Sequence, residues 1–180
     1  MTHTHLKDHE CDCGCHENVQ PAKEHVHGGT YIGDRNDGKM DGKGIYIYND
    51  GSQYIGMWKD DMMHGEGTHT WPSGEKYMGQ WQNDEKHGYG VYSWPDGESY
   101  AGYWKNGIKS GKGVYTWFDK DTYAGEWKDD LRHGHGIYTW FDGDKYIGEW
   151  NNDIREGKGM YICANGEVHM GEFKNNILQE

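Results

Sequence analysis

Three cysteines and one histidine lie close together near the beginning of the chain, at Cys11, Cys13, Cys15 and His16. Thiolate and imidazole groups suit Zn²⁺ or Cu(I), so this run could hold a soft metal ion. Zinc sites usually separate paired cysteines by about two to four residues, and the Cys-x-Cys spacing strains a tetrahedral site. The alternative is a polar segment that becomes ordered only against a partner. We therefore predict no bound metal ion or other cofactor.

A histidine also recurs at a fixed spacing, at His64, His87 and His133. Copies of one position on alternate strands of a sheet would lie roughly 10 Å apart, which is too far to share a metal ion. Repeated identical sites also lack the single asymmetric arrangement that catalysis requires. We interpret these histidines as hydrogen-bonding turn residues. The Asp-Gly-Asp run at 142–144 lacks the other EF-hand ligands and is interpreted as a turn. No catalytic residue is predicted, and the protein is expected not to be an enzyme.

These side chains belong to a unit of 23 residues that recurs without a gap. Positions 4 and 17, counted from an opening Tyr at position 0, together hold all nine tryptophans, and a Gly-x-Gly pair fills positions 11 and 13. A fixed period of about 20–50 residues indicates a repeat architecture. The opening residues are Tyr31, Tyr54, Tyr77, Tyr100, Tyr123, Tyr146 and, in a degenerate copy, His169.

Within each unit, the aromatic and glycine positions follow a period of two. Tyr54, Gly56 and Trp58 would share one face of an extended segment, as expected for a strand. Asp, Asn and Gly cluster between such segments, and these residues accept the positive φ angles that tight turns require. Lys120 stands where most units have Gly, which places a lysine at an expected positive φ. Each unit is therefore predicted to form two short antiparallel strands.

Glycine and aromatic residues are expected to form one packing system. A glycine in a strand leaves a slot in the sheet surface, and a Tyr or Trp ring of a neighbouring strand can cover the bare backbone. The ring stack would run from unit to unit, so that each unit supports its neighbours. We predict an all-β fold, an elongated single-layer antiparallel meander of six to seven β-hairpin repeats of 23 residues.

The pattern Tyr-x-Gly-x-Trp, followed by His-Gly-x-Gly and Asp-Gly, resembles the MORN repeat over about residues 29–175. Within that family, segments 31–36 and 121–136 are most similar to the MORN protein of the ciliary radial spoke head. The resemblance implies a scaffold that contacts other radial spoke head and stalk proteins and takes part in ciliary motility. It also implies a location in the cytoskeleton of the cilium or flagellum axoneme. The Cys- and His-rich N-terminal residues depart from the family pattern.

The composition argues against several classes of partner. The chain has 180 residues, a net charge of −12 and 33% hydrophobic residues, fewer than the roughly 45–50% of ordinary globular domains. Nucleic acids and anionic membranes require a basic surface, so neither is an expected direct partner. The sequence shows no secretory or membrane-spanning run. Closely spaced cysteines in a polar segment indicate a reducing compartment. We expect a cytoplasmic location.

Three segments are predicted. Residues 1–27 form a Cys- and His-rich tail that is flexible or bound to a partner, residues 28–175 form the repeat domain, and residues 176–180 form a C-terminal cap. Arg35 interrupts the aromatic column of the first unit, as expected for a terminal unit with one side in solvent.

The aromatic columns predict a protein-binding surface. Tyr and Trp offer large, stiff contact areas with a polar tip, which suits interface anchors. The alternative is that the rings only pack on the glycines. We predict a non-catalytic structural scaffold that binds protein partners through an aromatic groove; the alternative function is a membrane- or cytoskeleton-tethering adaptor outside cilia. The predicted partner-binding residues are Trp58, Trp81, Tyr92, Trp94, Trp104, Tyr115, Trp117, Trp127, Tyr138 and Trp140.

Overall fold

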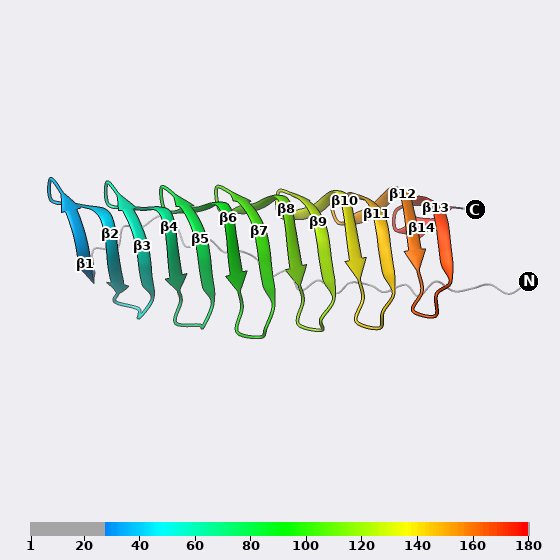
Figure 1. Ribbon diagram of the computed structural model, residues 1–180, viewed down its shortest axis with the longest axis horizontal. Helices are drawn as coiled ribbons and strands as arrows, with labels where there is room; N and C mark the ends of the chain where they lie inside the picture. Colours follow the sequence, from blue (N-terminus) through cyan, green and yellow to red (C-terminus); the bar gives the residue numbers. More distant parts are fainter. Residues whose placement is uncertain (1–27, 180) are drawn as a thin grey trace, which may run out of the picture.

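A computed structural model describes residues 28–179, and these residues form one open sheet of 14 antiparallel strands. The strands lie side by side in chain order, so each strand pairs with those before and after it in the sequence (Figure 1). The sheet runs from β1 at one end to β13 and β14 at the other. The predicted elongated single-layer meander of hairpin repeats is confirmed. Residues 28–179 contain no helix that could cross a membrane.

Each repeat contributes one odd-numbered and one even-numbered strand. The odd-numbered strands are β1 (Gly29–Asn36), β3 (Gln53–Lys59), β5 (Lys76–Gln82), β7 (Ser99–Lys105), β9 (Thr122–Lys128), β11 (Lys145–Asn151) and β13 (Val168–Lys174). The even-numbered strands are β2 (Lys39–Tyr48), β4 (Met62–Thr70), β6 (Glu85–Ser93), β8 (Ile108–Thr116), β10 (Leu131–Thr139), β12 (Ile154–Ile162) and β14 (Ile177–Leu178). The segment expected to be a cap contains β14, and Leu178 packs against the core.

Two kinds of turn connect the strands, and they lie at opposite ends of the strands (Figure 1). A two-residue turn joins β3 to β4, and its residues Asp60 and Asp61 have φ angles of 50° and 67°. Both values are positive, as a type I′ hairpin turn requires. Longer loops join even-numbered to odd-numbered strands, and there Lys120 has a positive φ of 77° and Gly143 one of 99°. The expected turns, including the one at 142–144, are confirmed.

The two glycines of each Gly-x-Gly pair have different roles, as the β3–β4 hairpin illustrates. Gly65 has a φ of 65° and lies in a bulge, where the pairing of β3 with β4 shifts between Gly56 and Trp58. A positive φ at a bulge favours glycine. Gly67 lies two residues further along and pairs directly with Gly56 across the two strands. This second glycine is required by side-chain packing.

The ring of Tyr54 lies across the Gly56–Gly67 pair, and a Cβ atom on either glycine would collide with it. Tyr54 is fully buried, and its hydroxyl donates a hydrogen bond of 3.0 Å to the backbone oxygen of Met57. The predicted packing of rings on glycines is therefore confirmed. The corresponding tyrosines Tyr77, Tyr100, Tyr123 and Tyr146 are also fully buried.

Candidate protein-interaction surface

The tyrosines at position 0 and the tryptophans at position 4 form one continuous stack. Tyr77 contacts Trp81 of its own repeat, with ring centroids 5.0 Å apart, and Trp104 of the next repeat at 5.6 Å. Tyr100 makes the same two contacts, with Trp104 at 5.0 Å and Trp127 at 5.3 Å. All four pairs are edge to face, a geometry that stabilises by about 0.5–1.5 kcal/mol beyond the buried area. Neighbouring repeats are thus held together ring by ring.

A second row of rings, at positions 15 and 17, runs beside the longer loops. Tyr92 lies 4.4 Å from Trp94, and Trp94 lies 5.6 Å from Tyr115 of the next repeat. Tyr115 in turn lies 4.6 Å from Trp117, which lies 5.2 Å from Tyr138. This row also passes from one repeat to the next without interruption.

The predicted partner-binding residues all belong to these two rows. Trp94 and Trp117 are half-buried and pack against the core. Among the predicted residues, these two rings therefore keep the most area that a partner could contact, and both lie beside the longer loops. The other eight residues are only 3–7% exposed: Trp58, Trp81, Tyr92, Trp104, Tyr115, Trp127, Tyr138 and Trp140.

Long side chains at position 9 cover the tryptophan row, a role that the alternation of glycine and aromatic residues does not reveal. The Nζ atom of Lys86 lies 4.3 Å from the centre of the Trp104 ring, and the guanidinium carbon of Arg132 lies 4.6 Å from Trp150. Cation–π contacts of this kind are worth about 0.5–2 kcal/mol. The only sequence signal is a recurring long side chain: Met40, Met63, Lys86, Lys109, Arg132, Arg155 and Leu178.

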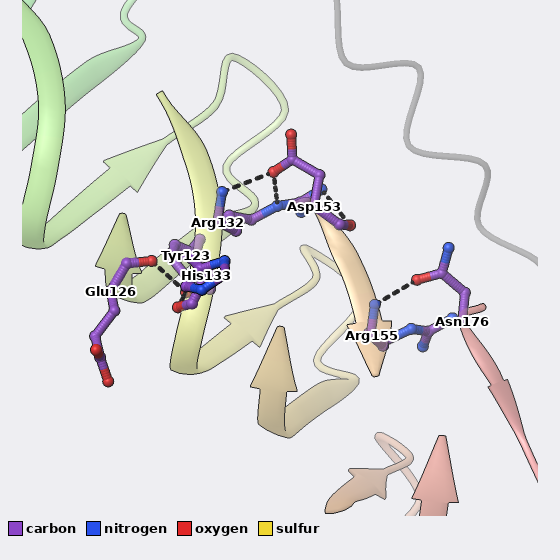
Figure 2. A network of polar contacts seen from close by, with 7 residues as sticks. All are labelled: Tyr123, Glu126, Arg132, His133, Asp153, Arg155 and Asn176. Atoms are coloured by element: carbon purple, nitrogen blue, oxygen red, sulfur yellow. Dashed lines mark hydrogen bonds and ion pairs between the residues drawn. The ribbon is translucent and has the colours of Figure 1, made fainter. Parts of the chain in front are cut away.

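An aspartate or asparagine in most two-residue turns ties its repeat to the one before it. The Asp153 Oδ1 atom accepts hydrogen bonds from the backbone N–H of Arg132 at 2.9 Å and from the Arg132 Nε at 2.8 Å (Figure 2). Asn176 accepts a bond of 2.8 Å from the backbone N–H of Arg155. Because the Arg132 side chain is only 5% exposed, this contact also pairs a buried charge.

Lys86 lacks such a turn carboxylate, because Gly107 stands where the later repeats have Asp130 and Asp153. The Lys86 residue is only 9% exposed, and its ammonium lies over the rings of both Tyr92 and Trp104. Burial lowers the pKa of Lys86 to about 8, while the carboxylate of Asp130 acts in the opposite direction. Lys86 is thus a buried cation whose charge is only partly compensated.

Acidic residues at position 21 connect neighbouring repeats by hydrogen bonds beside the longer loops. The hydroxyl of Tyr138 donates a hydrogen bond of 2.6 Å to Asp121 of the preceding repeat, and the backbone N–H of Phe141 donates one of 2.8 Å. Asp144 receives the equivalent bonds from Tyr161 and from the backbone of Ala164. Each carboxylate therefore fixes the longer loop of the next repeat.

The longer loops carry the most exposed aromatic side chains among the described residues. Phe118 and Phe141 follow the last ring of their repeats and are 65% and 75% exposed. Because Asp121 holds the backbone at Phe141, its ring extends from a fixed loop. We call Phe118, Phe141, Trp94 and Trp117 together the loop-edge surface.

The opposite face of the sheet carries a row of aliphatic side chains. Ile32 pairs with Ile45, and Ile45 pairs with Ile55, across three neighbouring strands. Ile55 is 51% exposed and Met78 is 53% exposed. Side chains alternate between the two faces of a strand, so these residues point away from the buried tyrosines. We call Ile32, Ile45, Ile55, Met78 and Val114 the outer stripe.

The histidine column does not have the predicted role. His64, His87 and His133 lie within β4, β6 and β10, and their Nδ1 atoms have no hydrogen-bond partner among the described residues. The backbone oxygen of His133, by contrast, accepts a bond of 3.3 Å from the Tyr123 hydroxyl (Figure 2). The interpretation as hydrogen-bonding turn residues is wrong, because the strands extend through this column. The Cys- and His-rich run at 11–16 lies outside the described residues.

A family model described as "MORN repeat" matches six consecutive segments, residues 31–53, 54–76, 77–99, 100–122, 123–145 and 146–168. Each matched segment begins at the Tyr of position 0, so the matches coincide with the unit found in the sequence. No curated protein matches the chain.

Two solved structures of Drosophila melanogaster Sas-4 are distantly similar to this chain. The TCP domain of SAS-4 (dCPAP), solved with a proline-rich motif of Ana2 (dSTIL), has a TM-score of 0.36 at 12% identity and covers 81% of this chain and 90% of its own. The TCP10c domain of Sas-4 has a TM-score of 0.38 at 12% identity and covers 81% of this chain and 99% of its own.

Proposed function

The chain belongs to the MORN-repeat family, and on this premise we propose that it is a non-catalytic structural scaffold that binds other proteins. The observation that carries the proposal is the exposure of two aromatic rings on fixed loops, Phe118 at 65% and Phe141 at 75%. Aromatic rings are the side chains that most often anchor an interface, and a partner that covers them removes apolar area from water. The loop-edge surface is the proposed binding site.

The charge around the loop-edge surface suits a basic partner. Asp96, Asp119 and Asp142 are exposed in the same loops, and the whole chain has a net charge of −12. Complementary charge accelerates association and selects among partners. The proposed partner segment therefore combines apolar side chains, which cover the phenylalanines, with Lys or Arg beside them.

The rings of the two buried rows have a supporting role in this proposal. Trp94 and Trp117 contact the partner through their exposed portions, and the eight buried rings of the predicted set hold them in place. An aromatic groove in which all ten rings touch a partner would require the position 9 side chains to move off the tryptophan row. The narrower contact at the loop edge needs no such rearrangement.

We further propose that the partners are radial spoke head and stalk proteins in the axoneme of a motile cilium or flagellum. The support is the resemblance of segments 31–36 and 121–136 to the MORN protein of the radial spoke head. The alternative is an adaptor outside cilia that tethers cytoskeleton or membrane, for which the exposed outer stripe provides an apolar surface. The acidic net charge opposes contact with anionic lipids.

The test is affinity purification of the full chain from a ciliated cell, followed by mass spectrometry, with two matched double variants. Phe118→Ser/Phe141→Ser removes the exposed rings of the loop edge, and Ile55→Ser/Met78→Ser removes similar apolar area from the outer stripe. We expect the wild type to recover radial spoke components and the loop-edge variant to lose at least roughly tenfold of this recovery, since interface anchors are worth 2 kcal/mol or more. The outer-stripe variant should retain it.

Thermal unfolding of both variants provides the folding control, because all four side chains are at least half exposed and both variants should unfold near the wild-type temperature. Recovery of cytoskeletal or membrane-trafficking proteins instead of spoke components would refute the ciliary assignment. Loss of partners in the outer-stripe variant alone would refute the loop edge as the binding site.

A further inference from the structure

The last repeat replaces two aromatic positions with metal-ligating residues. Cys163 stands at position 17, where the other repeats have Tyr or Trp, and His169 stands at position 0, where they have Tyr. Glu167, at the recurring acidic position 21, lies between them in the sequence. Cys163 and Glu167 lie in the loop between β12 and β13, and His169 lies in β13 itself. In the sequence, Cys163 and His169 look only like departures from the repeat pattern. In the folded hairpin, they lie close to each other and to Glu167.

The side chains converge in the structure. One ligand atom from each of Cys163, Glu167 and His169 lies within 4.8 Å of the other two, and residues 28–179 contain no second group of this kind. The His169 Nε2 atom lies 3.2 Å from the Glu167 Oε1 atom. Ligands bound tetrahedrally to zinc at about 2.0–2.3 Å are separated from one another by roughly 3.4–3.6 Å. The histidine and the carboxylate are already near this separation, and the thiol lies within 4.8 Å of both.

Backbone hydrogen bonds hold Cys163 and Glu167 in place, and His169 is placed by its pairing with Tyr161 across β12 and β13. The N–H of Cys163 donates a hydrogen bond of 2.8 Å to the Glu167 oxygen, and the N–H of Gly166 donates one of 2.8 Å to the Cys163 oxygen. The side-chain oxygen of Asn165 accepts a hydrogen bond of 2.9 Å from the backbone N–H of Glu167. Cys163 and His169 are half-buried and Glu167 is exposed. The cluster is therefore preorganised and open to solvent on one side.

The electrostatic environment favours a cation. The carboxylates of Asp144 and Glu167 both act electrostatically on the Cys163 thiol and give this site negative charge. At position 21 of an internal repeat, Asp121 accepts a hydrogen bond from a tyrosine hydroxyl of the next repeat. The carboxylate of Glu167, at the same position of the last full repeat, instead contacts His169. A divalent ion would compensate the negative groups and hold the thiolate in its charged form.

We propose that Cys163, Glu167 and His169 form a Zn²⁺-binding site, with the fourth tetrahedral position open to water. The donor set of one sulfur, one nitrogen and one oxygen suits the borderline character of zinc, and three protein ligands plus water is a common open arrangement. The site would fix the connection between β12 and β13 and stabilise the end of the sheet. It is independent of partner binding at the loop edge.

The test uses Co²⁺ as a spectroscopic probe and Zn²⁺ as the competitor, in a full chain with Cys11, Cys13 and Cys15 changed to Ser. Cys163 is then the only thiol, because the sequence has four cysteines. We expect one thiolate-bound Co²⁺ per chain, seen as a thiolate-to-cobalt charge-transfer band that Zn²⁺ abolishes. Cys163→Ser in this background should remove the band, and His169→Tyr and Glu167→Gln should each weaken binding at least roughly tenfold.

The matched control is His135→Tyr, because His135 lies 4.0 Å from Glu126 on an exposed part of β10 and has the same pair of groups without a thiol. This control should leave Co²⁺ affinity unchanged. His169→Tyr installs the residue of the internal repeats, and its circular dichroism is expected to match that of the background. The proposal is overturned if saturating Co²⁺ gives no thiolate band, or if His169→Tyr binds as tightly as His135→Tyr.

Discussion

Lys86, which is buried over the rings of Tyr92 and Trp104, should make the stability of the sheet depend on pH. The pKa of Lys86 is about 8 in the folded protein, against 10.5 for an ordinary lysine. Between these two values the unfolded chain binds more protons than the folded one, so the free energy of unfolding should rise as pH increases from about 8 to about 10.5. Lys86→Met copies Met63 of the preceding repeat and should abolish the rise. Chemical denaturation from pH 7 to about 9.5 measures the effect.

The same variant should be more stable than wild type at pH 7 by at most on the order of 3 kcal/mol, since one pKa unit corresponds to about 1.4 kcal/mol and the lost cation–π contacts offset part of the gain. Lys105→Met, at an exposed position of β7, is the control and should leave the pH dependence as it is. Gly107→Asp supplies the carboxylate that other repeats have and should also flatten the rise. An unchanged pH dependence in Lys86→Met would show that another group causes it.

The paired strands depend on glycine at two positions for different reasons, and the packing glycine gives the sharper prediction. A Cβ on Gly113 would collide with the ring of Tyr100, which is fully buried and cannot leave its place without opening the stack. Gly113→Ala should therefore lower the free energy of unfolding by about 1–3 kcal/mol, as overpacking does. Denaturant titration measures this loss.

Val114→Ala is the matched control on the same strand, because Val114 is 44% exposed on the opposite face. It should change stability by about 0.5 kcal/mol or less, as surface substitutions usually do. Equal losses in the two variants would contradict the packing role of the second glycine.

At the scale of the whole molecule, residues 28–179 form a one-dimensional array, in which each strand pairs only with the strands before and after it. Deletion of residues 77–99 removes one matched repeat and joins Lys76 to Tyr100 in register. The shortened chain should keep its β circular dichroism, unfold at a lower temperature and be shorter by roughly 10 Å in solution scattering, since two strands are lost. Deletion of residues 85–96 removes one strand with its loop and reverses the direction of all later strands. It should abolish cooperative unfolding, and a folded product would refute the nearest-neighbour description.

The sequence by itself determined the meander, because its signals are local. Tyr54, Gly56 and Trp58 alternate with a strand period, Asp60 and Asp61 fit a type I′ turn, and the unit recurs at a fixed length. Trp94 and Trp117 of the loop-edge surface were also identified from the sequence, since they occupy a fixed column, whereas Phe118 and Phe141 were not predicted.

Only the tertiary structure decided how these columns are used. Trp104 is buried because Lys86, Tyr77 and Tyr100 cover it from two repeats, and this covering depends on pairing between strands. The two glycines of Gly-x-Gly look equivalent in sequence, but the bulge gives one a positive φ and the glycine pair places the other under a ring. Cys163 and His169 likewise meet only because the hairpin folds. Local patterns set the direction of each side chain, whereas the contacts between repeats set its exposure and its chemistry.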